Sequence, residues 1–169
     1  PLLSNIYLNP LDPQMASAWY EMVRYADDFG IVCRTKEQAQ AALERVAAWT
    51  AEAGLTLHPE KTRIADAVEE AFEFLGYRFE RGRKWPREKS LAKLREAIRA
   101  KTRRTDGRML QVIVADVNNT LRGWFGYFKH SHRRTFRDVD GWIRQRLRSV
   151  LRRRHKRRGR ARGLDHHRW

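Results

Sequence analysis

The sequence contains a single cysteine, Cys33. One thiol cannot form a disulfide framework within the chain, and it excludes zinc sites that are built on cysteine pairs. Cys33 ends the apolar run 29–33, and we interpret it as a small core residue rather than a nucleophile. Residues 81–169 also lack an apolar run of about 18 residues, which excludes a membrane-spanning helix there. The single cysteine fits a reducing compartment. No signal peptide is visible, and because the sequence begins without methionine we expect a piece of a longer protein.

Acidic residues are scarce in the second half of the chain. Residues 1–80 contain 7 Lys and Arg against 13 Asp and Glu, a net charge of −6, whereas residues 81–169 contain 29 against 7, a net charge of +22. This asymmetry predicts two parts with different tasks, of which the basic one binds a polyanion. Nucleic acid fits better than an anionic membrane surface, because a membrane would not explain the aromatic residues among the basic ones.

The first eighty residues show a mixture of helical and strand patterns. Residues 2–12 have apolar side chains at helical spacing, and we expect Pro10 and Pro13 to close that helix. Residues 20–34 contain two β-prone runs on either side of Ala26-Asp27-Asp28. This pattern predicts a hairpin with both carboxylates at its tip.

A capped helix and a second hairpin are predicted next. Thr35 with Gln38 three residues later is a capping box, and the helix that it opens should end at Gly54. Residues 55–57 are expected to form a short strand, and residues 72–79 a further strand or hairpin. The inner stripe of the helix would consist of Leu43, Val46, Thr50 and Ala53.

We divide the chain at a polar connector. Residues 1–80 form the first part, residues 81–90 the connector, and residues 91–158 a helical domain. The helical domain should hold three helices, the last of them capped by Thr135 with Asp138. Residues 159–169 have no apolar face and are expected to form a flexible basic tail unless RNA holds them.

The adjacent carboxylates Asp27 and Asp28 are the sharpest candidate site. Two carboxylates at a tight turn repel each other, and a divalent cation relieves that repulsion. Mg²⁺ prefers carboxylate oxygens and keeps room for water and substrate phosphates. Two such ions can activate a primer hydroxyl and neutralise the leaving pyrophosphate. Taken alone, Asp-Asp is more often an ordinary solvated turn.

The context of this pair resembles the reverse transcriptase family. In that family Tyr-x-Asp-Asp between two apolar strands is the metal motif, and alanine at x, as in residues 25–28 here, is typical of group II intron enzymes. Residues 1–12 resemble the helix after the template-contacting loop. Residues 54–63 resemble the strand and turn that carry a palm lysine, and residues 74–77 resemble the primer-grip hairpin. Four blocks in this order are far more specific than one tetrapeptide.

The resemblance implies a role for each matching residue around the carboxylates. Asp27 would be the main metal ligand, and Asp28 would support the metal or the primer end. Tyr25 and Ala26 would lie near the incoming nucleotide and the primer terminus. Lys61 would approach the triphosphate, and the equal alternative is a surface lysine in a Pro-Glu-Lys turn.

The second hairpin would contact the primer. The resemblance implies that Phe74, Leu75, Gly76 and Tyr77 hold the primer backbone. A glycine is needed where another chain approaches the backbone closely, which suits Gly76. The alternative for Phe74 and Leu75 is a place in the hydrophobic core.

Residues 121–131 place aromatic side chains among basic ones. Lysine and arginine bind phosphates, and exposed aromatic rings stack on unpaired bases. Trp124, Phe125 and Phe128 share a helical face, although such a stripe is more often core. Gly123 and Gly126 would permit close backbone approach.

The same segment resembles the maturase-specific region of group II intron proteins, where a similar Leu-Arg-Gly-Trp segment precedes a basic helix. The last four of the expected RNA-binding residues would form a ladder along that helix, suited to a phosphate backbone. A solvated charged face is the alternative for the basic residues. The expected RNA-binding residues are Arg122, Trp124, Lys129, Arg133, Arg134, Arg144, Arg148, Arg152 and Lys156.

The sequence therefore predicts an α+β chain, in which part of a reverse transcriptase palm precedes an all-helical basic thumb and maturase bundle. The parent protein is expected to be an RNA-directed DNA polymerase that also acts as a maturase in group II intron splicing and retrohoming. Mg²⁺ would be its cofactor. Its partners would be the intron RNA, dNTPs, and an RNA template with a DNA primer or target DNA. We expect a bacterial-type cytoplasmic location, associated with the nucleoid through nucleic acid and without a membrane partner.

The sequence does not contain the family's first palm segment, which carries a separate metal-binding aspartate. Two-metal catalysis needs ligands from both palm segments. We therefore expect the chain alone to be inactive as a polymerase. One alternative is a non-enzymatic RNA-binding splicing factor derived from such a protein. A second is a basic DNA-binding protein unrelated to polymerases, for which the four palm-like blocks would be coincidence.

Overall fold

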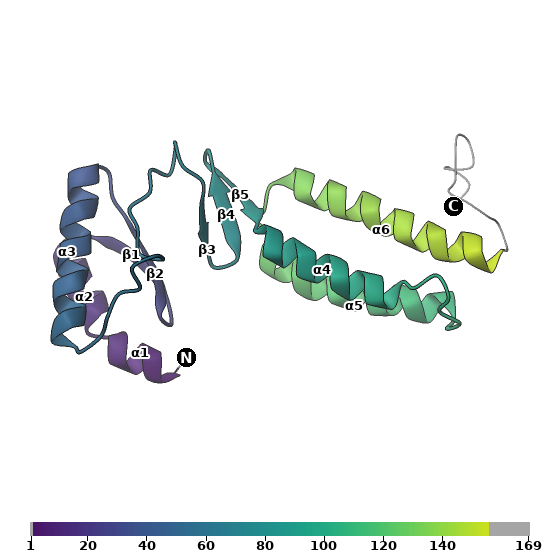
Figure 1. The fold of residues 1–169 in the computed structure, drawn as a ribbon, viewed down its shortest axis with the longest axis horizontal. Helices are drawn as coiled ribbons and strands as arrows, with labels where there is room; N and C mark the ends of the chain where they lie inside the picture. The colour runs from purple at the N-terminus through teal and green to yellow at the C-terminus, as the bar shows by residue number, and fades with distance from the viewer. Residues whose placement is uncertain (1, 156–169) are drawn as a thin grey trace. The chain divides into compact units, whose positions relative to one another are not determined.

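The computed structural model describes residues 2–155, which contain six helices and two small antiparallel sheets (Figure 1). The predicted α+β class is confirmed. The chain divides into two compact units between Glu70 and Ala71. This division lies upstream of the predicted connector 81–90, because the second sheet belongs to the second unit. The predicted tail 159–169 lies outside the described residues.

The first unit begins with two short helices instead of the one that was predicted. Helix α1 spans Leu2–Leu8 and helix α2 spans Leu11–Ser17. Pro10 is the N-cap of α2, and Pro13 lies inside its first turn. The prediction that Pro13 closes a helix was wrong, because the first-turn N–H groups have no partner within a helix and a proline there loses nothing.

The predicted hairpin is present in the first unit. Strand β1 (Glu21–Tyr25) pairs antiparallel with strand β2 (Asp28–Val32), with Tyr25 opposite Asp28. The hydrophobic core of this unit consists of buried side chains of α2 and α3, with half-buried residues of the hairpin packed against it. Cys33 is among these half-buried residues, as its interpretation as a core residue required, and burial raises the pKa of its thiol. The buried members are Leu11, Met15, Ala42 and Val46.

Helix α3 (Lys36–Glu52) begins as the capping box predicted. The Thr35 hydroxyl accepts a hydrogen bond from the backbone N–H of Gln38, at 3.2 Å. The Gln38 side chain accepts a hydrogen bond from the backbone N–H of Arg34, at 2.9 Å. In a standard capping box the donor would be the N–H of Thr35, one residue later. Gly54, with φ +69°, follows the end of the helix. The predicted strand 55–57 is absent from this described segment, which has no regular secondary structure.

The second unit opens with a three-stranded sheet in the order β3-β4-β5. Strand β3 is Phe72–Phe74, β4 is Tyr77–Glu80 and β5 is Arg83–Pro86. The first two strands are the predicted hairpin, and the rings of Phe72 and Phe79 stack across it at 4.9 Å. The third strand corrects the prediction that residues 81–90 are a connector. Their polar side chains resemble a loop, but their backbone completes the sheet.

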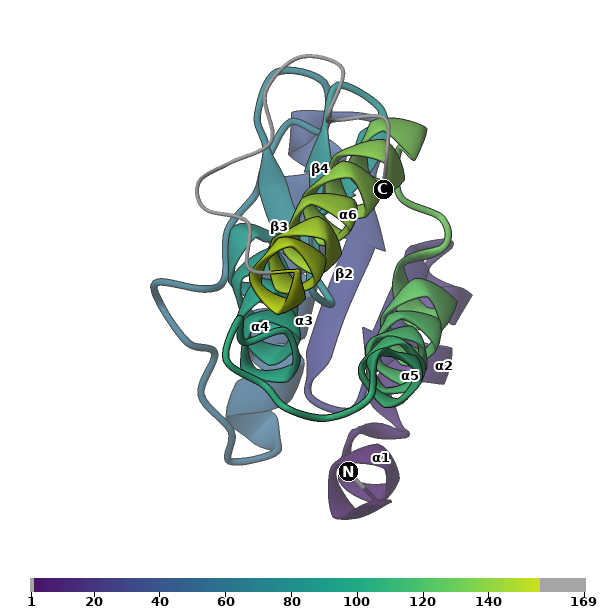
Figure 2. The same cartoon turned by 90° about the vertical axis from the view of Figure 1, so that its right-hand side faces the viewer.

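Three helices follow the sheet, as predicted: α4 (Glu88–Lys101), α5 (Leu110–Phe128) and α6 (Arg133–Arg154). Figure 2 shows them nearly end-on, at the corners of a triangle. Among the described residues, no helix is long and apolar enough to cross a membrane. The core between the helices consists of Leu94, Ile98, Val117 and Ile143, with half-buried Leu121, Trp124, Val139, Trp142 and Leu147 against it.

One local prediction for these helices was wrong, and the one for the two glycines stays a prediction. Helix α6 begins at Arg133, two residues before the predicted cap, and its N-cap is His132, whose side chain accepts from the N–H of Arg134. Thr135 is instead buried inside the helix. Gly123 and Gly126 face open space within this chain, because a Cβ added at either would meet nothing within 4 Å.

The C-terminal end of α4 is held by an arginine of α6. Arg146 Nε donates to the Thr102 hydroxyl at 3.1 Å, and its Nη2 donates to the Thr102 carbonyl at 2.9 Å. Burial, with the nearby charge of Arg99, lowers the pKa of Arg146. The guanidinium therefore binds the C-cap residue of α4 and satisfies a carbonyl group at the end of the helix.

Candidate functional site

The two candidate carboxylates lie at the β1–β2 turn. Ala26 and Asp27 form a two-residue turn, and Asp28 is the first residue of β2. Ala26 has a φ of +56°, the left-handed conformation that tight hairpin turns require at this position. Tyr25, Asp27 and Asp28 are all exposed, so both carboxylates are open to solvent and to ligands.

The chemistry of this turn suits a hard divalent cation. Carboxylate oxygens are the ligands that Mg²⁺ prefers, and Asp27 and Asp28 offer them from adjacent positions. Within residues 2–155, no group of three or more His, Cys, Asp or Glu side chains is arranged to hold a metal ion. The pair can therefore form part of a metal site, and the remaining ligands would have to come from substrate, water or other protein segments.

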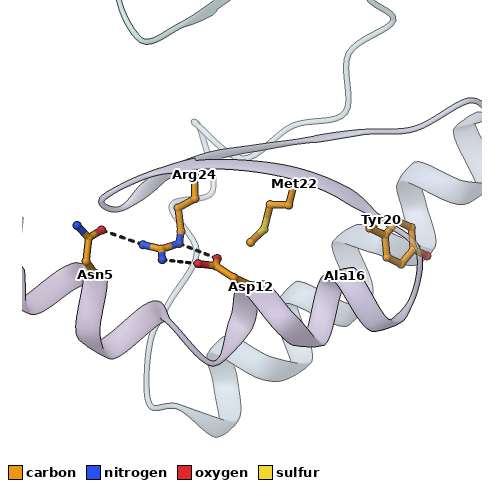
Figure 3. A pocket seen from close by; sticks show the side chains of 6 residues that line it. All are labelled: Asn5, Asp12, Ala16, Tyr20, Met22 and Arg24. Carbon is orange, nitrogen blue, oxygen red and sulfur yellow. Dashed lines mark hydrogen bonds and ion pairs between the residues drawn. The ribbon is translucent and has the colours of Figure 1, made fainter.

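Arg24 lies directly behind the turn and connects it to both N-terminal helices (Figure 3). Its guanidinium forms a two-pronged ion pair with Asp12 of α2, at 2.8 and 2.5 Å. It also donates to the side chain of Asn5 in α1 and to the carbonyl of Ala26, each at 3.0 Å. The hydrogen bonds from Arg24 to Asp12 hold the pKa of the Asp12 carboxyl below its usual range. The three side chains line a shallow pocket together with Ala16, Tyr20 and Met22.

Lys61 lies in an exposed turn of the same unit. Its backbone N–H donates to the carbonyl of His58 at 3.2 Å. In the described part of the chain, no hydrogen bond or ion pair joins its side chain to Asp27 or Asp28. The approach of Lys61 to the triphosphate stays a prediction.

The β3–β4 turn contains the four predicted primer-contacting residues. Leu75 and Gly76 occupy the turn, with φ values of +47° and +79°. Phe74, Leu75, Gly76 and Tyr77 are all half-buried, which is intermediate between a core position and an open surface. Gly76 is close to other side chains, because a Cβ there would lie 3.7 Å from Phe128 and 3.8 Å from Tyr127.

Both carbonyls of this turn are held by the helical part of the second unit. The Tyr127 hydroxyl of α5 donates to the Leu75 carbonyl at 2.7 Å. The Gly76 carbonyl accepts from the backbone N–H of Arg87 at 2.9 Å and from the Ser90 hydroxyl at 3.5 Å. The turn therefore belongs to the helical unit, and this explains why the chain divides at residue 70 rather than 80.

Two tyrosines make this attachment reciprocal. The Tyr77 hydroxyl donates to the Tyr127 carbonyl at 2.5 Å, and the two rings stack at 5.9 Å. Burial, with Tyr127 beside it, raises the pKa of the Tyr77 hydroxyl. Lys84 lies over the Tyr77 ring, 5.9 Å from its centroid. Tyr127 was not among the residues that the sequence singled out.

The predicted RNA-binding residues fall into two groups. Arg122, Lys129, Arg133, Arg134 and Arg144 are exposed on α5, on α6 and between them. Arg148 is half-buried, and Lys156 lies outside the described residues.

Two members of the predicted RNA-binding set pack against the protein itself. Arg152 is only 7% exposed and points into the protein rather than along a surface ladder. Trp124 is packed against the helical core, in ring contact with Phe128 at 5.1 Å. The exposed aromatic side chains of this segment are instead Phe125 and Tyr127, at 51% and 55%.

One signal in the sequence could have identified Arg24. Alternation along β1 places Met22 and Arg24 on the same half-buried face. A cation at an inward strand position requires an anionic or carbonyl partner. Nothing local indicates that this partner is Asp12, which lies on another element.

Comparison with known protein families identifies both parts of the chain. Residues 1–79 match the reverse transcriptase (RNA-dependent DNA polymerase) family, and residues 91–169 match the group II intron maturase-specific domain. No curated protein matches the sequence significantly. The two matches follow each other in the order that the four palm-like blocks and the Leu-Arg-Gly-Trp segment indicated. The chain thus belongs to the group II intron reverse transcriptases that also act as maturases, and it carries a reverse transcriptase segment followed by the maturase-specific domain.

Proposed function

We propose that this chain binds group II intron RNA through the exposed cations of α5 and α6, in support of splicing and retrohoming. The observation that carries the proposal is the group of five exposed basic side chains on α5, on α6 and between them, inside the segment that matches the maturase-specific domain. Phosphates bind such side chains wherever they are open to solvent. Exposed Phe125 lies between Arg122 and Lys129 in sequence and offers a ring on which an unpaired base can stack.

The test is RNA affinity measured by fluorescence anisotropy over a series of salt concentrations. Replacing both Arg122 and Lys129 by Gln should weaken binding of intron RNA and reduce the salt slope by about 2, one unit for each lost phosphate contact. Arg45→Gln, at an exposed position of α3 in the first unit, is the control and should change neither. Equal affinity for intron RNA and duplex DNA at matched salt would favour an unspecific basic protein and contradict the proposal.

The reverse transcriptase segment is proposed to contribute to RNA-templated DNA synthesis. Mg²⁺ would be held by Asp27 with the help of Asp28, and it would neutralise phosphate charge and activate the primer hydroxyl. Tyr25 and Ala26 would lie beside the nucleotide, a dNTP, and Lys61 would approach its triphosphate. The β3–β4 turn would hold the DNA primer paired to the RNA template. The exposure of both carboxylates supports this assignment.

The chain by itself is proposed to be inactive as a polymerase. Two-metal catalysis needs more ligands than one carboxylate pair, and the described residues offer no third ligand beside it. Primer extension by the purified chain would contradict this. The same observation favours the second candidate, a non-enzymatic RNA-binding splicing factor. If Asp27→Asn leaves binding of a divalent cation at the turn unchanged, the second candidate is the better account.

The proposed place of action is the bacterial cytoplasm, at the nucleoid. It rests on the partners, since intron RNA and target DNA both occur there, and on the basic charge of residues 81–169. Imaging of a fluorescent fusion before and after deletion of the intron RNA would test it. A fusion that ignores both DNA and intron RNA contradicts the proposal.

A further inference from the structure

Arg24 is a charged residue on the inward-facing side of strand β1. Exposed and half-buried residues alternate along the strand, and Arg24 shares the half-buried face with Met22. Its side chain is only 11% exposed. A guanidinium in such a place must have acceptors on several sides, because burying a charge without partners is costly.

The acceptors come from three different segments, as Figure 3 shows for two of them. Asp12 of α2 takes two parallel hydrogen bonds, from Nε at 2.8 Å and from Nη2 at 2.5 Å. This two-pronged geometry is specific to the arginine fork and is not available to lysine. Nη1 donates to the Asn5 side chain of α1 at 3.0 Å. The guanidinium plane is therefore fixed from both helices.

The remaining contact reaches the carboxylate turn. Nη1 also donates to the carbonyl oxygen of Ala26 at 3.0 Å. That carbonyl belongs to the peptide group between Ala26 and Asp27, and Ala26 is in a left-handed conformation that alanine seldom adopts. Because a peptide group is planar, fixing its oxygen also fixes the nitrogen from which Asp27 departs. The hydrogen bond thus restrains the backbone from which the first carboxylate projects.

The positive charge of Arg24 is neutralised by Asp12, close to the carboxylate turn. Asp12 is paired with the guanidinium through both of its oxygens. An unpaired cation behind Asp27 and Asp28 would oppose the approach of a second cation. The ion pair therefore lets Arg24 hold the turn without adding a net positive charge beside it.

From these contacts we infer that Arg24, oriented by Asp12, is a positioning residue for the carboxylate pair. It fixes the peptide group between Ala26 and Asp27, so that Asp27 and Asp28 present their oxygens to a divalent cation in one arrangement. The inference rests on the proposed metal role of Asp27 and Asp28. It also predicts that Arg24 fixes the conformation of the β1–β2 turn when no metal is bound.

The first measurement uses the full chain without metal and records the NMR amide signals of Asp27 and Asp28. Arg24→Gln removes the guanidinium, and Arg24→Lys keeps the charge but not the fork. Both should shift the two signals, and Asp12→Asn should shift them less because it leaves the Ala26 contact in place. Arg45→Gln is the matched control on an exposed face of α3. Circular dichroism identifies any variant that does not fold, and the folded variants decide the outcome.

The second measurement adds Mn²⁺ alone and follows the paramagnetic broadening of the same signals. Arg24→Gln should weaken Mn²⁺ affinity at the turn about tenfold, as expected for losing one hydrogen bond from a charged group, and Arg45→Gln should leave it unchanged. Unshifted Asp27 and Asp28 signals in both Arg24 variants would overturn the inference. Broadening that survives Asp27→Asn would instead overturn the proposed metal role, so the two failures are distinguishable.

Discussion

Replacing Gly76 by alanine tests the geometry of the β3–β4 turn. Gly76 has a φ of +79°, and an alanine in the left-handed region costs about 1–2 kcal/mol. Space is not the obstacle, because the added Cβ would meet its nearest neighbours, in Phe128 and Ser90, at 3.7 Å, an ordinary van der Waals distance. The expected loss in the free energy of unfolding is therefore the backbone cost alone.

Gly82 provides a matched control for this variant. It occupies the β4–β5 turn with a φ of +68° after Arg81 at +49°, and a Cβ there would meet nothing within 4 Å. Gly82→Ala should lose about the same 1–2 kcal/mol in urea unfolding. The two variants should differ in primer binding, since only Gly76 lies in the turn proposed to hold the primer. Affinity for a primer–template duplex should fall for Gly76→Ala and stay unchanged for Gly82→Ala.

Two results would refute this reasoning. A loss for Gly76→Ala that exceeds the loss for Gly82→Ala by several kcal/mol would mean that the turn is packed too tightly for a methyl group. A loss near zero for both would mean that the backbone does not have the left-handed conformation. Equal primer affinity for the two variants would remove the primer-holding role and leave the turn as a structural element.

Three further predictions concern the core, the basic helix and acid stability. Ile98, fully buried between the helices, should cost about 2–5 kcal/mol of unfolding free energy when replaced by alanine, measured by urea denaturation. Arg152→Gln should lower stability with little specific effect on RNA affinity. Arg144→Gln, at an exposed position, should lower RNA affinity and leave the urea midpoint unchanged. The reverse pattern would mean that Arg152 belongs to an RNA-binding surface. Arg24 lowers the pKa of Asp12 below 3.8, so the ion pair stabilises the fold above about pH 4, and this contribution is lost as the pH falls through the lowered pKa. The stability difference between the native chain and Asp12→Asn should therefore shrink at pH 3 in urea titrations, and a constant difference would contradict it.

Features set by neighbouring residues could be predicted from the sequence. The β1–β2 hairpin depends on two β-prone runs around a short turn, and the start of α3 depends on Thr35 and Gln38. Both are present as predicted. Pro13 shows the limit of such rules, because a proline signals either the end of one helix or the first turn of the next. Only the packing of α2 against the core decides between them.

Features that join distant residues could not be predicted in this way. The Arg24 contacts link residues 12 positions apart, and the Tyr127–Leu75 bond spans 52 positions. No local pattern encodes either pair. The burial of Arg152 has a different origin. Each residue turns about 100° around a helix, so residues four apart drift by about 40°, and Arg152 lies about 80° around α6 from exposed Arg144. The candidate carboxylates were found because their motif is local, and their supporting residues were missed because that support is not.

The attachment of the β3–β4 turn to α5 has a mechanical consequence. Tyr127 and Arg87 hold the two turn carbonyls, so a movement of the turn is coupled to a movement of the helices. The proposed primer contact and the exposed cations of α5 thus belong to one connected part of the second unit. A load applied by RNA at Arg122 and Lys129 would be transmitted to the primer strand as a displacement of the turn. The proposed binding of intron RNA and the proposed primer contact would then be mechanically coupled within this unit.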